Sequence, residues 1–97
     1  MKAPLVYDVP DDRVRTRVAD TCLDYGLVRI QFSAFFGELT ANQQEELILK
    51  LRRRVGRFAC NIQLFPIAER EIRLRKIIHV PDKPAEAGQT PVLAGSR

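Results

Sequence analysis

The apolar residues at the start of the chain change period once, and the change separates a predicted strand from a predicted helix. Residues 5–9 form a short apolar run that Pro10 ends, as is typical of a strand terminus. From residue 12 the apolar positions recur every three or four residues until Gly26, which can end a helix in the left-handed conformation. We therefore expect a strand over 5–9 and a helix over 12–25, with Asp11 or Asp12 as its N-cap.

Alternation with a period of two follows over residues 27–39, which is long for one strand. We therefore predict a hairpin that turns near residues 31–34. Thr40 and Gln43 have the spacing of a capping box, so a second helix is expected to start there, run to Val55 and end at the following glycine.

The last third of the chain contains two further predicted strands and a tail. Residues 58–64 alternate again until Pro66 stops the pattern, and the segment from Leu74 to Val80 reads as a shorter fifth strand. Residues 81–97 hold three prolines and two glycines with almost no large apolar groups. We predict one folded domain over 1–80 and a flexible tail over 81–97.

The order of elements is β-α-β-β-α-β with a strand appended, which is the ferredoxin-like pattern of an α+β fold. Right-handed crossovers place both helices on one face of an antiparallel sheet and leave the other face open. A half-apolar open face on so short a chain predicts a homodimer packed through the sheets. Alternation assigns the following residues to the open face: Val6, Asp8, Arg29, Gln31, Ser33, Ala59, Asn61, Gln63 and Phe65.

Composition limits the classes of protein to which the chain can belong. The 97 residues include 16 Lys and Arg against 12 Asp and Glu, so the formal net charge is +4. Cys22 and Cys60 are too few for a disulfide framework or a zinc site, and both are expected to be reduced core residues of a cytoplasmic protein. No apolar run is long enough to span a membrane or to mark export. A single histidine and the lack of a glycine-rich phosphate loop exclude serine triads and P-loop enzymes.

Asp8 stands within an apolar strand, where a carboxylate is costly to bury without a partner. It is either a strand-end residue that caps the turn at Pro10 or the next helix, or a ligand of a hard cation such as Mg²⁺, which needs one or two protein carboxylates. A two-fold axis near Asp8 would bring two carboxylates together, so the metal and the dimer form one hypothesis. Asp11 and Asp12 are better explained as acids at a helix start.

Arginines gather at the start of the first helix, where the helix macrodipole disfavours them. Asp20 and Asp24 stand at the opposite end, so stability does not explain the arrangement. Arginines beside the free amides of a helix start can bind phosphate, and the alternative is a solvated basic turn neutralised by Asp11 and Asp12. The arginines are Arg13, Arg15 and Arg17.

Two residues of the predicted hairpin are further candidates for contacts with nucleic acid. Arg29 is expected to project from the sheet in register with Gln31, toward phosphate or a partner chain. Phe35 and Phe36 could stack on a base, although two aromatic residues in a hairpin are more often part of a core.

Four segments together strongly resemble the Cas2 family of CRISPR-associated endonucleases. The resemblance covers about residues 4–80 and rests on a strand-end Asp before a basic helix and on an Arg-x-Gln-x-Ser-x-Phe-x-Gly stretch; the segments are 7–12, Arg15 with Arg17, 25–39 and 64–67. It implies a ferredoxin-like homodimer in which Asp8 from both chains faces a shared Mg²⁺. It also implies roles in nucleic-acid handling for Arg15, Arg17, Arg29 and Phe35.

The resemblance implies two functions, namely a metal-dependent nuclease of RNA or duplex DNA and a non-catalytic scaffold that bridges integrase (Cas1) dimers during spacer acquisition. Our leading hypothesis is a dimeric, Mg²⁺-dependent endonuclease of CRISPR adaptation, with Asp8 as the catalytic and metal-binding residue. A scaffold without hydrolysis is the alternative, and a toxin-type ribonuclease on the same fold is a more remote one. The expected nucleic-acid-binding residues are Arg13, Arg15, Arg17, Arg29 and Phe35.

Overall fold

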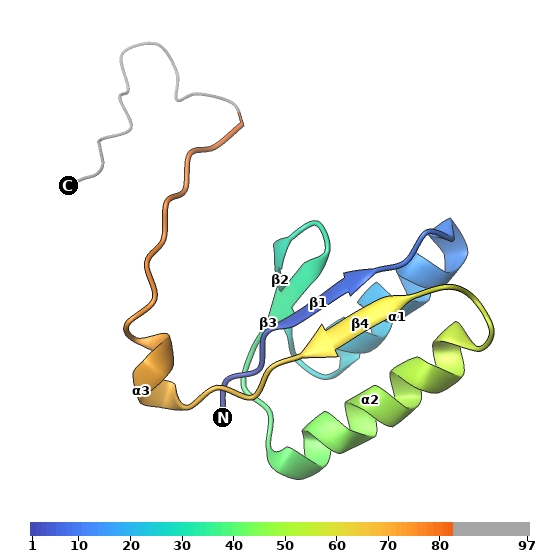
Figure 1. Cartoon of the computed structure of the whole chain (residues 1–97), viewed down its shortest axis with the longest axis horizontal. Helices are drawn as coiled ribbons and strands as arrows, with labels where there is room; N and C mark the ends of the chain where they lie inside the picture. The colour runs from blue at the N-terminus through green and yellow to red at the C-terminus, as the bar shows by residue number, and fades with distance from the viewer. Residues whose placement is uncertain (83–97) are drawn as a thin grey trace.

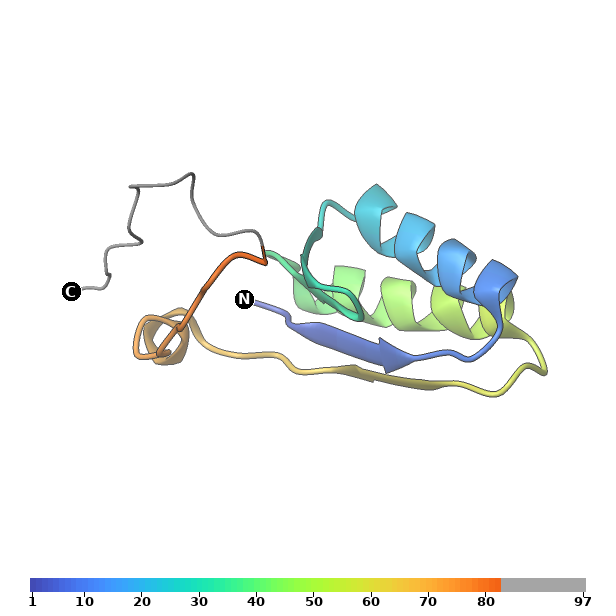
Figure 2. The same ribbon diagram turned by 90° about the horizontal axis from the view of Figure 1, so that it is seen from above.

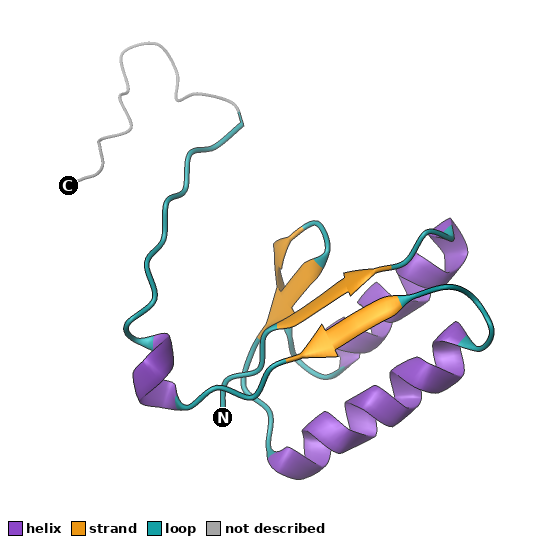
Figure 3. Ribbon diagram, in the orientation of Figure 1, coloured by secondary structure: helices purple, strands orange, loops and turns teal. Residues whose placement is uncertain are grey.

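The computed structural model describes residues 1–82 and contains a four-stranded sheet, two long helices and one short helix (Figures 1 and 3). Their bounds are β1 Leu5–Asp8, α1 Asp12–Asp24, β2 Val28–Gln31, β3 Ala34–Phe36, α2 Ala41–Val55, β4 Asn61–Leu64 and α3 Glu69–Ile72. The predicted flexible tail over 81–97 lies outside the described residues except for its first two, so the division of the chain at residue 80 stays a prediction.

The sheet is antiparallel and open, with the strand order β2-β3-β1-β4. Both long helices lie on one of its faces, as the view in Figure 2 shows. The strand order and the single helical layer confirm the predicted ferredoxin-like α+β fold through its fourth strand. Along residues 1–82, none of the helices has the length and apolar character needed to cross a membrane.

Both long helices begin where the sequence predicts, because a side chain caps each of them. Asp11 accepts a hydrogen bond from the amide of Val14 at 3.0 Å, and Thr40 and Gln43 form both bonds of the capping box before α2. Gly26, with a φ of 82°, makes the left-handed turn after α1. The apolar sides of the helices then pack on the sheet; the largest fully buried side chains are Phe35, Leu5, Leu27, Leu39, Leu47 and Leu51.

The two faces of the sheet differ in exposure along β1. Tyr7 points into the core, whereas Val6 and Asp8 are exposed on the open face. Strand pairing extends this face to β4, where Gln63 lies opposite Val6 and Asn61 lies opposite Asp8. The assignment of these residues to the open face is confirmed.

The assignment of Arg29 to the open face is wrong. Arg29 pairs with Phe35, which is fully buried under the helices, and its guanidinium carbon lies 5.1 Å from the centroid of the Phe35 ring. The register of β2 against β3 shifts between Arg29 and Gln31, so Gln31 pairs with Ala34 on the open side. A bulge of one residue reverses the alternation beyond it, which is why a strict period of two placed Arg29 on the wrong face.

The fourth strand is shorter than predicted. It begins at Asn61, opposite Asp8, and the residues before it precede the ladder. Beyond Asp8 the first strand reaches Pro10, which has no amide hydrogen to offer a partner strand. Cys60 is consequently exposed, which corrects the prediction that both cysteines are core residues; Cys22 is buried as expected.

No fifth strand forms within residues 1–82. After α3, the segment 73–82, which we call the C-terminal arm, leads away from the sheet as a loop (Figures 1 and 3). A strand must exchange hydrogen bonds with a neighbour, and neither edge of this sheet pairs with the arm. The prediction of a strand from Leu74 to Val80 is therefore wrong for a single chain. The arm leaves four large apolar side chains exposed: Leu74, Ile77, Ile78 and Val80.

Candidate nucleic-acid interface

Asp8 lies at the end of β1 on the open face, close in sequence to the start of α1. Its side chain is exposed and forms no salt bridge within residues 1–82. The capping role that could have explained Asp8 belongs to Asp11, which accepts the amide of Val14. Asp8 thus presents carboxylate oxygens to solvent, ready to bind a cation or a donor from another molecule.

Arg15 is fixed against the loop that follows Asp8. Its Nη1 donates to the carbonyl oxygens of Val9 at 2.8 Å and Pro10 at 3.3 Å, and its Nη2 pairs with Asp12. These bonds tie the first turn of α1 to the end of β1. Arg15 therefore positions the backbone next to Asp8, and part of its charge is already neutralised.

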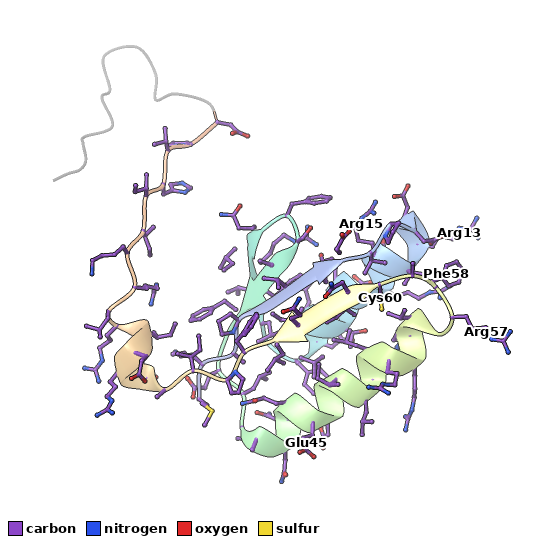
Figure 4. All side chains as sticks on the ribbon, viewed as in Figure 1. Arg13, Arg15, Glu45, Arg57, Phe58 and Cys60 are labelled. Atoms are coloured by element: carbon purple, nitrogen blue, oxygen red, sulfur yellow. The ribbon has the colours of Figure 1, made fainter. Side chains whose placement is uncertain are left out.

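Arg13 and Arg17 differ from Arg15 in being exposed and in forming no salt bridge with any part of the described chain. Figure 4 shows Arg13 and Arg15 at the same end of the molecule as Arg57. Free guanidinium groups beside the amides of a helix start suit the binding of phosphate. Arg15 is the arginine that pairs with Asp12, and Asp11 and Asp12 line one groove with Arg13 and Arg17, so phosphate binding by these two arginines stays a prediction beside the alternative of a solvated basic turn.

The turn between β2 and β3 is held by side chains from two strands. The carbonyl oxygen of Phe32 accepts a hydrogen bond from the Tyr7 hydroxyl at 3.3 Å and another from Arg29 Nη1 at 3.1 Å. The Phe32 ring is 70% exposed, and its centroid lies 5.7 Å from Cζ of Arg29 and 6.0 Å from Cζ of Arg15. Both distances lie in the range of cation–π contacts. Arg29 and Arg15 thus meet at the hairpin tip from a strand and a helix that are separate in sequence.

Phe35 is not accessible to a base. Its ring is fully buried and stacks on Tyr7 with the centroids 6.1 Å apart, so it supports Arg29 from within the core. The prediction that Phe35 contacts nucleic acid directly is wrong for the folded chain. Sequence reasoning missed Phe32, the exposed aromatic residue of the hairpin. The available signal was an aromatic residue inside a predicted turn, where side chains are rarely covered.

Burial under the helices raises the pKa of two groups close to Arg29. Desolvation raises the pKa of the Cys22 thiol to about 12, with Arg29 opposing the rise. Desolvation also raises the pKa of the Tyr7 hydroxyl, and the positive charges of Arg29 and Arg15 oppose it in part. Both groups are therefore neutral near pH 7, and neither supplies a negative charge to Arg29.

Asp8 is the candidate metal ligand in the described part of the chain. Over residues 1–82, no three side chains of His, Cys, Asp or Glu gather in one place. Asp8 suits a hard cation because its carboxylate is exposed and without an ionic partner, whereas Asp11 and Asp12 are engaged in a cap and a salt bridge. Mg²⁺ at Asp8 stays a prediction, with one carboxylate from this chain and, in a dimer, a second from the other copy.

Comparison with known proteins identifies the family of the chain. The family model for CRISPR associated protein Cas2 matches residues 1–77. A protein of Desulforudis audaxviator named CRISPR-associated endoribonuclease Cas2 is 42% identical over 91 residues, which are 90% of this chain and 86% of the relative. A second one, CRISPR-associated endoribonuclease Cas2 2 of Chloroflexus aurantiacus, is 46% identical over 78 residues, or 80% of this chain and 92% of the relative.

Two other similar proteins add a fusion and a fold. A Thermoproteus tenax protein named CRISPR-associated endonuclease Cas1/endonuclease Cas2 fusion is 36% identical over 80 residues, which are 82% of this chain and 30% of the fusion. The crystal structure of Streptococcus pyogenes Cas2 at pH 6.5 has a TM-score of 0.68 over 81% of this chain and 100% of that one, at 21% identity, a likeness of fold. A family model that spans most of the chain and relatives above 40% identity establish that this chain belongs to the CRISPR-associated Cas2 family.

Proposed function

We propose that two copies of this chain form a divalent-cation-dependent endonuclease of RNA or DNA that acts in CRISPR adaptation. The observation that carries the proposal is the carboxylate of Asp8, exposed on the open face without an ionic partner among residues 1–82. Two relatives above 40% identity are named endoribonucleases. A cation such as Mg²⁺, held by Asp8 from each chain, would supply an activated water and neutralise charge on the scissile phosphate.

Exposed apolar side chains support the presence of a second copy. A contiguous apolar surface that is left uncovered usually marks an interface. The exposed apolar residues of the open face and its edges include Val6, Val28, Ile30 and Phe65. The C-terminal arm adds Ile78, which is 94% exposed, and an extended segment can form a strand on the edge of a second sheet.

The arginines of α1 have separate tasks in this proposal. Arg13 and Arg17 bind phosphate groups of the nucleic-acid backbone, because their side chains are exposed and unpaired within residues 1–82. Arg15 holds the loop beyond Asp8 through the carbonyl oxygens of Val9 and Pro10 and so keeps the carboxylate in place. Binding through phosphate contacts is expected to weaken steeply as the salt concentration rises.

The Asp8→Asn variant tests the nuclease. We expect cleavage of RNA or duplex DNA in the presence of Mg²⁺ to fall at least about 100-fold, the loss of several kcal/mol of charge stabilisation. The measurement is a single-turnover cleavage assay on the purified protein, with unfolding curves to show that the fold is kept. Asp24→Asn, at the far end of α1, is the matched control and should cleave as wild type does. Equal cleavage by Asp8→Asn and wild type would contradict the mechanism.

The second candidate function is a scaffold that clamps a duplex between integrase subunits without hydrolysis. The observation that favours it is the relative in which Cas1 and Cas2 form one polypeptide. Under this function, Asp8→Asn retains spacer integration with the cognate integrase, whereas the double variant Arg13→Glu, Arg17→Glu loses duplex binding and integration. Integration that depends on the Asp8 carboxylate, in a variant that still dimerises, would exclude the pure scaffold.

A further inference from the structure

We infer that the Phe32 ring, together with the guanidinium groups of Arg15 and Arg29, forms a stacking site for an unpaired base of a nucleic-acid strand. The inference rests on the proposed function in that it takes a nucleic acid as the ligand. It adds a position at which this chain would distinguish an unpaired nucleotide from a paired one.

The exposure of Phe32 is the first observation behind the site. A side chain that is 70% exposed contributes little to the core, and leaving a benzene ring in water has no benefit for folding. Hydrogen bonds from Tyr7 and Arg29 to the carbonyl oxygen of Phe32, at 3.3 and 3.1 Å, hold its backbone, and the guanidinium groups of Arg29 and Arg15, 5.7 and 6.0 Å from the ring centroid, restrain the ring itself. An anchored, exposed ring has lost part of its freedom before a ligand binds, which lowers the entropic cost of stacking.

The surroundings of the ring are the second observation. Phe32 and Arg29 line one side of a groove of about 430 Å³, and α1 lines the other side with Arg15. The groove also contains the carboxylates of Asp12 and Asp20, so its two positive charges are balanced by two negative ones. A balanced groove does not attract phosphate strongly, whereas a flat π system can stack on the ring and on the planar guanidinium groups.

The geometry favours an unpaired base over a base within a duplex. Paired bases are stacked on their neighbours, and one side chain at a hairpin tip cannot reach their faces without unstacking them. A base in a single strand or an overhang has a free face, and stacking on an aromatic side chain contributes about 1–3 kcal/mol per base for any of the bases. Arg13 and Arg17 line a separate groove on another side of α1, so the stacking site rests on Phe32, Arg15 and Arg29 alone.

The experiment is a thermodynamic cycle between the Phe32 ring and the bases. Binding of full-length wild type and Phe32→Leu is measured by fluorescence anisotropy, each with a short single strand and with the same strand made of abasic sugars. We expect wild type to bind the strand with bases about tenfold more tightly than the abasic strand, and Phe32→Leu to lose most of this ratio. Strands of ribose and of deoxyribose are tested separately. Phe32→Trp keeps a stacking surface and should retain the ratio.

Each outcome decides between the inference and the proposed function. An unchanged ratio in Phe32→Leu overturns the stacking site, even if all strands bind. No binding of any strand or blunt duplex by wild type overturns both the site and the proposed function. Phe58→Ala removes another exposed ring, 52% exposed in the loop before β4, and should leave the ratio unchanged. If Phe58→Ala lowers the ratio as much as Phe32→Leu does, the preference for bases comes from exposed apolar side chains in general. That outcome would overturn the specific role of Phe32.

Discussion

The two faces of the sheet differ in whether other parts of the same chain cover them. The covered face is completed by the chain itself: Phe35 stacks on Tyr7, and Arg29 lies over Phe35 and bonds to the hairpin carbonyl. The open face carries the Asp8 carboxylate without an ionic partner in the described chain, and the neighbouring C-terminal arm exposes its large apolar residues. Truncation of a buried side chain on the covered face should therefore destabilise the fold, and a change on the open face should impair function or association without affecting the fold.

The largest expected effect is on the covered face, from Phe35→Ala. Truncation of a fully buried phenylalanine removes the aromatic stack and leaves a cavity, at a cost of about 3–5 kcal/mol in the free energy of unfolding. The measurement is a urea titration followed by circular dichroism. Loss of nucleic-acid binding with an unchanged free energy of unfolding would instead show that Phe35 contacts nucleic acid. The covered face would then carry function and not only stability.

Alkaline pH should also act on the covered face. The Cys22 thiol has a pKa of about 12 in the folded chain, raised from an ordinary value of 9.0, so the folded state keeps a proton that the unfolded state loses. Stability is therefore complete below about pH 9 and falls toward pH 12, by at most about 1.4 kcal/mol per pH unit for this group. Unfolding midpoints of wild type and Cys22→Val, compared across this range, measure the effect. The same alkaline slope in both proteins would assign the loss to other groups, such as Tyr7.

On the arm, Ile78→Asp is expected to change association and to spare the fold. Ile78 is 94% exposed in the single chain, so its replacement should alter the free energy of unfolding of the monomer by less than about 0.5 kcal/mol. If a second copy covers it, the charge should weaken dimerisation at least about tenfold in sedimentation equilibrium. Leu49→Asp, on the exposed side of α2, is the matched control and should not affect association. If wild type and Ile78→Asp dimerise equally well, the arm is not part of the dimer interface.

The smallest expected effect is that of Tyr7→Phe. This variant keeps the stack on Phe35 and removes only the hydroxyl that donates to the Phe32 carbonyl at 3.3 Å. Because Arg29 still bonds to that carbonyl, no buried acceptor is left unsatisfied, and the cost should be about 0.5–1 kcal/mol. Chemical unfolding measures it, and a cost near that of Phe35→Ala would mean that the hydroxyl holds far more of the hairpin than its one hydrogen bond.

Local patterns in the sequence predicted most of the fold. The 3.6-residue period, the Asp11 cap and the capping box at Thr40 placed both long helices within one or two residues, because these signals act over a single turn. The predictions failed where a residue depends on a distant partner. β4 starts at Asn61 since that residue pairs with Asp8, and the arm forms no strand because it pairs with neither edge of the sheet.

The candidate site could be predicted only in part for the same reason. Asp8, Arg13 and Arg17 are exposed as their positions in a strand end and a helix start indicate. Arg29 was assigned to the wrong face because of the bulge in β2, whereas Phe35 is buried because it pairs with Leu5 on the side of the sheet that the helices cover. The sequence gives no sign of this bulge, because the bulged residue is an isoleucine that fits the alternating pattern, and not a glycine.

The bulge in β2 also affects how copies of the chain can add to one another. β2 and β4 are the two edges of the sheet, and an irregular edge is a poor template for a further strand. Only β4 keeps a regular register along its length against β1. Growth by strand addition into an open filament requires two receptive edges on each unit. With one edge blunted, any addition of strands between copies would end after two chains, so this single irregular residue would disfavour growth into a filament.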